Sequence, residues 1–259
     1  MKITLHSQYD NFTIGKTPKY IQWIREPSKL HCYVNEYAAQ QPEENSIALI
    51  LEPRSIIPGV YNYIEEHWKD YKYVFTHDSK LMRIADNSHL ILFGGVWASD
   101  PREKTKDISM IASDKSMCTL HKIRAELARK LKDKIDCYGS SVVNYRISTE
   151  DAHGPYKFAV VIENYIDQDY FTEKICNCFA NKTIPIYCGA NNIGDYFNPD
   201  GIIEAVPSQI EQIIDSLDCE TEYNRRLDAV EDNYYKVKKY ACFEDWFYIA
   251  YSDLLEGLL

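Results

Sequence analysis

Two short apolar runs flank a helix-like stretch between Phe158 and Gly189, and this arrangement constrains the fold more than any other part of the sequence. Residues 158–162 (Phe-Ala-Val-Val-Ile) and 184–188 (Ile-Pro-Ile-Tyr-Cys) carry no charged residue, as in strands that are buried on both faces. A polar turn and a helical pattern over residues 170–180 join the two runs. A strand, a helix and a second strand in this order predict one unit of a parallel α/β sheet.

The same alternation of apolar runs and amphipathic stretches extends through the chain and predicts parallel α/β layers. The expected strands are residues 2–5, 47–52, 72–76, 89–93, 108–112, 134–138, 157–162, 184–188 and 202–204. The expected helices are residues 17–25, 58–68, 79–84, 119–132, 170–180, 208–217, 221–237 and 243–257.

One polar segment that contains proline and has no periodicity, residues 99–107, is the best candidate for a linker. We therefore expect an N-terminal Rossmann-like domain at residues 1–98 and a second such domain at residues 108–240, facing each other across a cleft. Residues 241–259 are expected to form a final helix that packs back across the domains, because aromatic and acidic residues alternate along it.

The net charge of the chain restricts its ligands. At −10 over 259 residues, the chain lacks the basic excess that general nucleic-acid binding requires. Its first residues, Met1–His6, are typical of a strand and not of a signal peptide, and no apolar run approaches membrane-spanning length. We expect a soluble, cytoplasmic protein that binds no nucleic acid and has no membrane-spanning segment.

A group of polar side chains follows the first of the two apolar runs. Its members are acidic, amide, phenolic and cationic: Glu163, Asn164, Tyr170, Glu173 and Lys174. Ligands of open α/β sheets bind at the carboxyl ends of the strands, so we expect a ligand here. These residue types suit a sugar joined to phosphates.

The pattern Asn164-x5-Tyr170-x-Thr-Glu173-Lys174, with Ile184-Pro-Ile-Tyr-Cys-Gly189 after it, resembles the donor-binding signature of glycosyltransferase family 10. Similar segments are Ser109-Met-Ile-Ala-Ser-Asp-Lys115, His121-Lys-Ile-Arg124, Ile135-Asp-Cys-Tyr-Gly139 and Asp195-Tyr-Phe-Asn-Pro-Asp-Gly201, so the resemblance covers residues 108–203. Members of this family are α1,3/α1,4-fucosyltransferases of the two-domain GT-B fold. The resemblance implies that fold, with GDP-fucose as the co-substrate and a glycan as the acceptor.

Two cations are the expected contacts of the donor diphosphate. Departure of a nucleoside diphosphate adds negative charge, which fixed cations stabilise most in the transition state. Lys174 lies in the first turn of the expected helix, where the helix dipole favours the same anion. Arg124 matches the family's diphosphate-binding arginine, and its planar donors suit bidentate contact. The alternative is that both are solvated helix residues.

Three neutral or acidic residues complete the expected donor site. As the family implies, Glu173 binds hydroxyls of the ribose or the donor sugar, Asn164 binds a phosphate or sugar oxygen, and Tyr170 contacts the nucleotide. The alternatives are a salt bridge within one helical turn for Glu173, a turn residue for Asn164 and a core aromatic for Tyr170. Gly139 and Gly189 follow expected strands, where the approach of a ligand or an ordinary turn explains a glycine equally.

The expected catalytic residue is Glu52, which ends a buried strand in the N-terminal half. Inverting transfer needs a general base for the acceptor hydroxyl, and partial burial raises a carboxyl pKa toward a useful range. Alternatively, Glu52 pairs with Arg54 on an exposed loop. Asp78 and His77 are reserve candidates for the base, and His121 is either structural or a second phosphate contact.

No metal site is expected, because no Asp-x-Asp follows a strand and no Cys/His cluster has zinc spacing. The sequence thus predicts an inverting, metal-independent α-fucosyltransferase without a cofactor, acting on a hydroxyl of an N-acetylglucosamine or glucose unit. Two alternatives stay open: the same chemistry with a different nucleotide sugar, and a non-catalytic glycan-binding protein.

Overall fold

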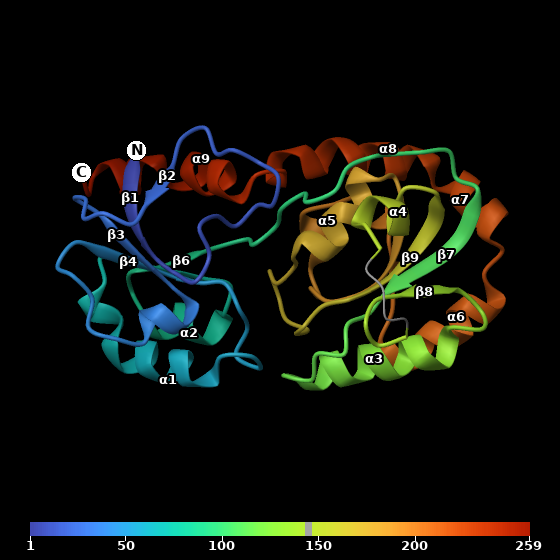
Figure 1. The fold of residues 1–259 in the computed structure, drawn as a ribbon, viewed down its shortest axis with the longest axis horizontal. Helices are drawn as coiled ribbons and strands as arrows, with labels where there is room; N and C mark the ends of the chain where they lie inside the picture. Colours follow the sequence, from blue (N-terminus) through green and yellow to red (C-terminus); the bar gives the residue numbers. More distant parts are fainter. Residues whose placement is uncertain (143–146) are drawn as a thin grey trace.

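Each half of the molecule is built on a parallel sheet, and the two halves lie side by side (Figure 1). The computed structural model describes residues 1–142 and 147–259. The strand order is β2-β1-β3-β4-β5-β6 in the first sheet and β11-β10-β9-β7-β8 in the second. Adjacent strands run parallel throughout both sheets as described. Two parallel α/β domains of this kind confirm the predicted fold class.

The elements of the first half begin at the N-terminus and end before the connection between the halves. The strands are β1 (Lys2–His6), β2 (Gln22–Ile24), β3 (His31–Val34), β4 (Ser46–Ile50), β5 (Tyr73–Thr76) and β6 (Ser88–Leu90). The helices are α1 (Pro58–His67) and α2 (Ser79–Ile84), with short 3-10 helices η1 (Asn35–Ala38) and η2 (Trp68–Asp70).

The elements of the second half follow the connection. The strands are β7 (Lys106–Ile111), β8 (Asp136–Tyr138), β9 (Tyr156–Ile162), β10 (Ile184–Cys188) and β11 (Ile203–Glu204). The helices are α3 (Thr119–Leu131), α4 (Thr149–His153), α5 (Glu173–Ala180), α6 (Ile210–Ser216), α7 (Cys219–Arg225), α8 (Leu227–Lys236) and α9 (Phe243–Glu256). Short 3-10 helices are η3 (Ile193–Asp195), η4 (Pro199–Gly201), η5 (Pro207–Gln209) and η6 (Val237–Tyr240).

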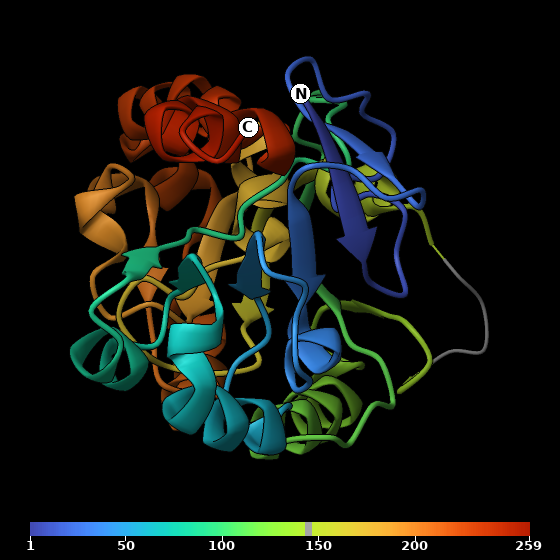
Figure 2. The same ribbon diagram turned by 90° about the vertical axis from the view of Figure 1, so that its left-hand side faces the viewer.

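Alternation along the central strands explains why both sheets are covered on both faces. In β4, Ile47 and Leu49 face the cluster that contains α9, whereas Ala48 and Ile50 face the cluster of α1 and α2. Figure 2 shows α9 on one side of this sheet and the pair α1 and α2 on the other. The core of the first half is therefore completed by a helix that follows the second half in the chain.

The last helix reaches the first half through a short crossing. Tyr240 packs in the core of the second half, and Phe243 and Phe247 pack in the core of the first. Trp246 contacts both cores. No helix in the described ranges is long and apolar enough to cross a bilayer.

Several details of the predicted elements are wrong. The expected helix at residues 17–25 is absent, because residues 22–24 pair with β1 as strand β2. β3 was not predicted, although it lies inside the sheet between β1 and β4. The helix expected at residues 170–180 begins only at Glu173, and the one expected at residues 221–237 is divided into α7 and α8.

Candidate active site

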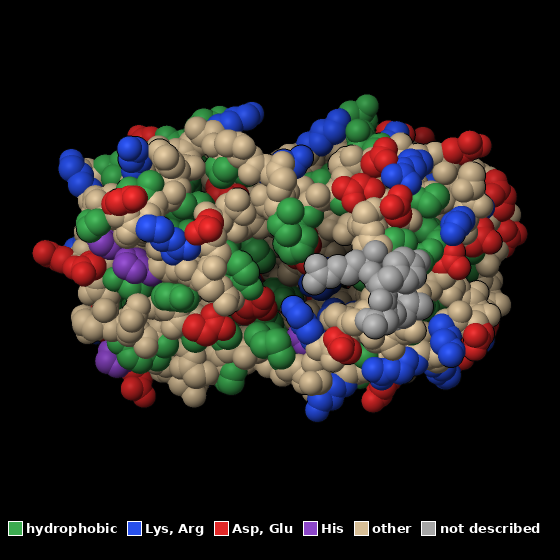
Figure 3. Space-filling model, in the orientation of Figure 1, with side chains coloured by type: hydrophobic (Ala, Val, Ile, Leu, Met, Phe, Trp, Pro, Cys, Tyr) green, Lys and Arg blue, Asp and Glu red, His purple; other side chains and the backbone are tan. Residues whose placement is uncertain are grey.

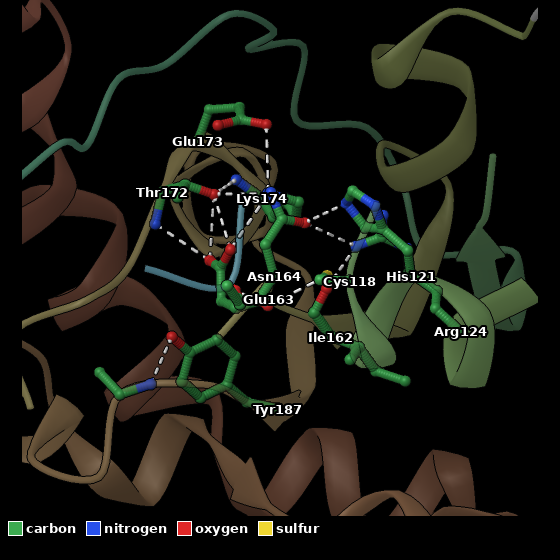
Figure 4. A network of polar contacts seen from close by, with 12 residues as sticks. Cys118, His121, Arg124, Ile162, Glu163, Asn164, Thr172, Glu173, Lys174 and Tyr187 are labelled. Atoms are coloured by element: carbon green, nitrogen blue, oxygen red, sulfur yellow. Dashed lines mark hydrogen bonds and ion pairs between the residues drawn. The ribbon is translucent and has the colours of Figure 1, made fainter. Parts of the chain in front are cut away.

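A fully buried carboxylate, that of Glu163, organises the carboxyl edge of the second sheet (Figure 4). It directly follows β9 and has none of its surface exposed. Its oxygens accept from the Thr172 backbone N–H at 3.0 Å, from Thr172 Oγ1 at 2.9 Å and from Lys174 Nζ at 3.1 Å. A charge at this depth is tolerated only with such donors, so Glu163 fixes the position of the loop that leads into α5.

Thr172 caps helix α5 and so determines where the helix begins. Its Oγ1 accepts from the backbone N–H of Lys174 and lies 2.9 Å from Lys174 Nζ. Glu173 therefore occupies the first position of the helix, with its carboxylate 3.7 Å from the same ammonium. Burial alone would lower the pKa of Lys174, but the carboxylates of Glu163 and Glu173 outweigh it and raise the pKa. Lys174 is a fixed, charged cation at a helix N-terminus.

Arg124 lies beside this cluster, on the buried face of α3. Its Nη1 donates to the carbonyl of Ile162 at 2.8 Å and approaches Asn164 Oδ1 at 3.4 Å. Burial lowers the pKa of the guanidinium, and the nearby Glu163 opposes that shift; a guanidinium stays charged in either case. Nη2 and Nε have no hydrogen-bond partner among the described residues, so they remain for an anion.

Glu52 follows β4 at the carboxyl edge of the first sheet. Its backbone N–H donates to Asn35 Oδ1 at 3.1 Å, and its carbonyl accepts from Tyr61 Oη at 2.9 Å, so the backbone is held on both sides. Burial is the main cause of a raised pKa for the Glu52 carboxyl; Lys174 opposes the shift and Glu173 adds to it. The pKa of the Glu52 carboxyl therefore depends on charges in the second half of the molecule.

The expected alternative for Glu52, a pair with Arg54, is wrong. Arg54 donates to both oxygens of Asp78, at 2.7 and 2.8 Å, and lies 2.7 Å from Glu65. Asp78 also accepts from the Leu81 backbone N–H and caps α2. These contacts hold Asp78 within the first domain as a structural residue.

Two contacts join the edges of the halves beside these residues. Ser55 Oγ donates to the Asn164 carbonyl at 3.4 Å, and the rings of His77 and Tyr170 lie 4.6 Å apart. The face of the molecule in Figure 3 is hollowed between the halves, with charged side chains of both signs at the edges. The two carboxyl edges therefore share one space.

The predicted residues occupy two environments. The structure brings Glu52, Arg124, Asn164, Glu173 and Lys174 to the facing edges. Tyr170 is only 2 % exposed and packs on His77, so almost none of its surface is accessible from the space between the halves. Its predicted contact with a nucleotide stays a prediction. Burial lowers the pKa of His77 to about 4, which leaves it neutral.

Gly189 directly follows β10, at a position where a side chain has no room. A Cβ at this position would lie 2.2 Å from Tyr187 Oη and 2.7 Å from Glu163 Cγ. A pocket of about 260 Å³ begins at Gly189 and continues between the ends of β10 and β11. The glycine is thus explained by the packing of Glu163 as well as by space for a ligand.

Glu163 is the member of the expected ligand-binding group to which the sequence assigned no specific contact. The available signal was a carboxylate placed directly after an uninterrupted apolar run, together with Lys174 at the start of the helix that follows. Its partners Thr172 and Lys174 become apparent only when the loop between them is folded.

Two facing parallel α/β domains, with Arg124 and Lys174 at the edge of the second, have the arrangement of the GT-B fold, which many glycosyltransferases share. Residues 101–245, more than half of the chain, match the family model described as glycosyltransferase family 10 (fucosyltransferase) C-term. The chain belongs to glycosyltransferase family 10, the fucosyltransferase family.

One curated relative is similar over a short segment, and two solved structures share the fold. An α-(1,4)-fucosyltransferase of Arabidopsis thaliana is 39 % identical over 49 residues, which is 19 % of this chain and spans 12 % of that protein's length. A structure of α1,3-fucosyltransferase with GDP has a TM-score of 0.55 at 16 % identity, over 94 % of this chain and 92 % of that one. A structure with GDP-fucose gives 0.55 at 17 %, over 90 % and 81 %.

Proposed function

We propose that the protein is an inverting α-fucosyltransferase that moves fucose from GDP-fucose to a hydroxyl of an N-acetylglucosamine or glucose unit of a glycan. The observation that carries the proposal is the contact between the two carboxyl edges: Ser55, three residues after Glu52, donates to the Asn164 carbonyl at 3.4 Å, and the charge of Lys174 acts on the pKa of the Glu52 carboxyl. A base and a cation on opposite sides of one space suit direct displacement at a sugar carbon. The relatives solved with GDP and GDP-fucose support this donor.

In the proposed reaction, Glu52 removes the proton of the acceptor hydroxyl as its oxygen attacks the anomeric carbon of the donor. The bond from that carbon to the phosphate oxygen breaks, and GDP leaves with the bonding electrons. Arg124 and Lys174 stabilise the charge that develops on the diphosphate. Attack from the face opposite the leaving group turns a β-linked donor into an α-linked product.

Glu173 and Asn164 have the polar groups that the rest of the donor requires. Glu173 is partly exposed, and a carboxylate beside a diphosphate is suited to accept hydrogen bonds from ribose or sugar hydroxyls. Asn164 offers its amide nitrogen at the end of β9, next to Arg124. We place the donor along these residues, with the acceptor on the side of Glu52.

The decisive experiment incubates the protein with GDP-fucose and a panel of lactose and N-acetyllactosamine acceptors, and detects the addition of a deoxyhexose by mass spectrometry. Thermal-shift measurements with GDP, UDP and CDP separate the choice of donor from the chemistry. Stabilisation by UDP and not by GDP would contradict the fucose donor and favour another nucleotide sugar.

We also propose that the reaction needs no metal ion, because the two fixed cations Arg124 and Lys174 are available to neutralise the diphosphate. Transfer measured in excess EDTA should match transfer without it. Loss of turnover in EDTA that Mn²⁺ or Mg²⁺ restores would overturn this proposal.

A further inference from the structure

The side chain of Asn164 is held in one orientation by two donors from helix α3 (Figure 4). His121 Nε2 lies 2.9 Å from Asn164 Oδ1, and Arg124 Nη1 lies 3.4 Å from the same oxygen. The Asn164 carbonyl accepts from Cys118 Sγ at 3.3 Å and from Ser55 Oγ at 3.4 Å. Both oxygens of Asn164 are therefore occupied by the protein.

The chemistry of these groups assigns the hydrogen atoms. A guanidinium has donors only, so the atom of Asn164 that faces Arg124 must be the oxygen. His121 must then donate from Nε2, because an amide oxygen cannot donate. Nδ1 of His121 is left without a proton and is buried with no partner among the residues described. Nδ2 of Asn164 likewise has no partner there, so its two N–H groups remain for a ligand.

We propose that His121 is a positioning residue, which holds the amide of Asn164 with its nitrogen directed at an oxygen of the bound donor. The inference rests on the proposed function, because it concerns the same nucleotide-sugar site. The opposite amide orientation would present an oxygen to an anionic diphosphate and repel it. Because the Arg124 contact is long and the His121 contact is short, His121 provides most of the orientation.

The position of His121 separates this role from direct contact with the donor. Its side chain is buried, with 3 % exposed, beneath Asn164 on the inner face of α3. The proposed action therefore passes through Asn164. This predicts that substitutions of His121 and Asn164 are not additive in donor affinity.

The experiment measures the dissociation constant of GDP by calorimetry for the wild type, for His121→Leu, His121→Gln and His121→Asn, for Asn164→Ala, and for the double variant His121→Leu/Asn164→Ala. We expect His121→Leu to weaken GDP binding about tenfold, the loss of one well-placed contact. Gln places an amide N–H near the position of Nε2 and should restore affinity to within about threefold, whereas the shorter Asn should not. The double variant should bind GDP no more weakly than Asn164→Ala alone.

His153→Leu is the matched control. His153 is a second buried histidine whose Nδ1 has no partner in the described part of the chain, and it lies on α4, away from the facing edges. This variant is expected to lower the Tm and leave GDP affinity unchanged. The control thus separates the general destabilisation caused by loss of a buried histidine from the specific loss of Asn164 positioning.

Additive effects in the double variant would mean that His121 acts on the donor directly, and would overturn the inference. Unchanged GDP affinity in His121→Leu would overturn it as well. If the wild type binds UDP and not GDP, the proposed donor is wrong, and the same variants are compared with UDP, because the argument concerns the diphosphate. Binding of neither nucleotide would contradict both proposals.

Discussion

Opposed charges around Glu52 set the properties of the proposed base at the scale of single residues. Burial raises the pKa of its carboxyl, and the charges of Glu173 and Glu36 add to the shift. Lys174 and Lys115 act in the opposite direction. A carboxyl with a raised pKa is a stronger base once ionised, so this balance suits removal of a proton from an alcohol.

Glu52→Gln should abolish transfer and leave donor binding intact. Loss of a general base lowers the rate by about 10²–10⁴-fold, while the amide keeps the size of the side chain. Transfer from GDP-fucose and GDP affinity by calorimetry are the two measurements. Glu36→Gln serves as the control: assayed at a pH well above the pKa of Glu52, it should transfer fucose at the rate of the wild type. Equal transfer by Glu52→Gln and the wild type would favour a glycan-binding protein or another base.

The pH dependence of transfer gives a second test of Glu52. The base must be ionised, so activity is lost as the pH falls through its pKa, which lies above the ordinary value of 4.5. Glu36→Gln removes a charge that raises this pKa and should move the acid limb of kcat/KM to lower pH. Lys115→Gln removes a charge that lowers it and should move the limb to higher pH. Shifts in the same direction would contradict the assignment.

The residues of the site differ in how far the sequence could predict them. Arg124, Glu173 and Lys174 lie on one short motif or one helix face, so their convergence at the facing edges follows from the fold class. The partner of Arg54 could not be predicted, because Asp78 and Glu65 come from α2 and α1 and only packing decides which carboxylate it meets. Glu163 needed the loop to Thr172 to be known.

At the scale of elements, the end of β10 leaves no room for a side chain at Gly189. Gly189→Ala places a methyl group against Tyr187 Oη and Glu163 Cγ, which must move. We expect a loss of about 1–3 kcal/mol in the free energy of unfolding. GDP binding should weaken too, since Glu163 holds Lys174. Urea unfolding and calorimetry check both effects.

Gly59→Ala is the control for this substitution. Gly59 lies in α1, and a Cβ there has no atom within 4 Å. Alanine in a helix is favoured over glycine by about 0.5–1 kcal/mol, so this variant should be as stable as the wild type or more so. A Gly189→Ala protein with the stability of Gly59→Ala would show that the end of β10 can relax.

The prediction of elements was correct for the long apolar strands and failed at the edge of the first sheet. The central strand β4 is buried throughout and β9 is buried except at Lys157, and this pattern can be read locally. β2 is short, and its outer residue Gln22 is exposed, so its apolar residues fit a helix as well as a strand. Its pairing with β1 joins residues far apart in the chain, and local sequence does not contain that information.

At the scale of the whole molecule, the chain crosses between the domains twice. The first crossing follows β6, and the backbone N–H of Trp97 donates to Asn177 Oδ1 of α5 at 3.0 Å. The second leads from η6 into α9, where the buried Glu244 accepts from the backbone of Phe12 at 2.8 Å. Both crossings are therefore fixed by hydrogen bonds to the domain that the chain enters or packs against.

Phe247→Ala should destabilise the first domain strongly. Phe247 is fully buried against Phe75 and Phe243, and truncation of such a side chain costs about 3–5 kcal/mol. Ile249→Ala, on the same helix but 66 % exposed, should change stability by less than about 0.5 kcal/mol. Calorimetric unfolding of both variants checks the pair, and similar losses would argue against the packing of α9 on this sheet.

The position of α9 has a consequence for biosynthesis. A ribosome makes β1–β6 first, but much of the cover on one face of that sheet comes from α9, with Phe243, Phe247 and Leu255, which are translated after the whole second domain. Nascent chains usually fold from the N-terminal domain onward. Here one apolar face of the first domain stays partly uncovered until α9 has been made. We therefore infer that the second domain folds first and that the nascent chain is a substrate for chaperones.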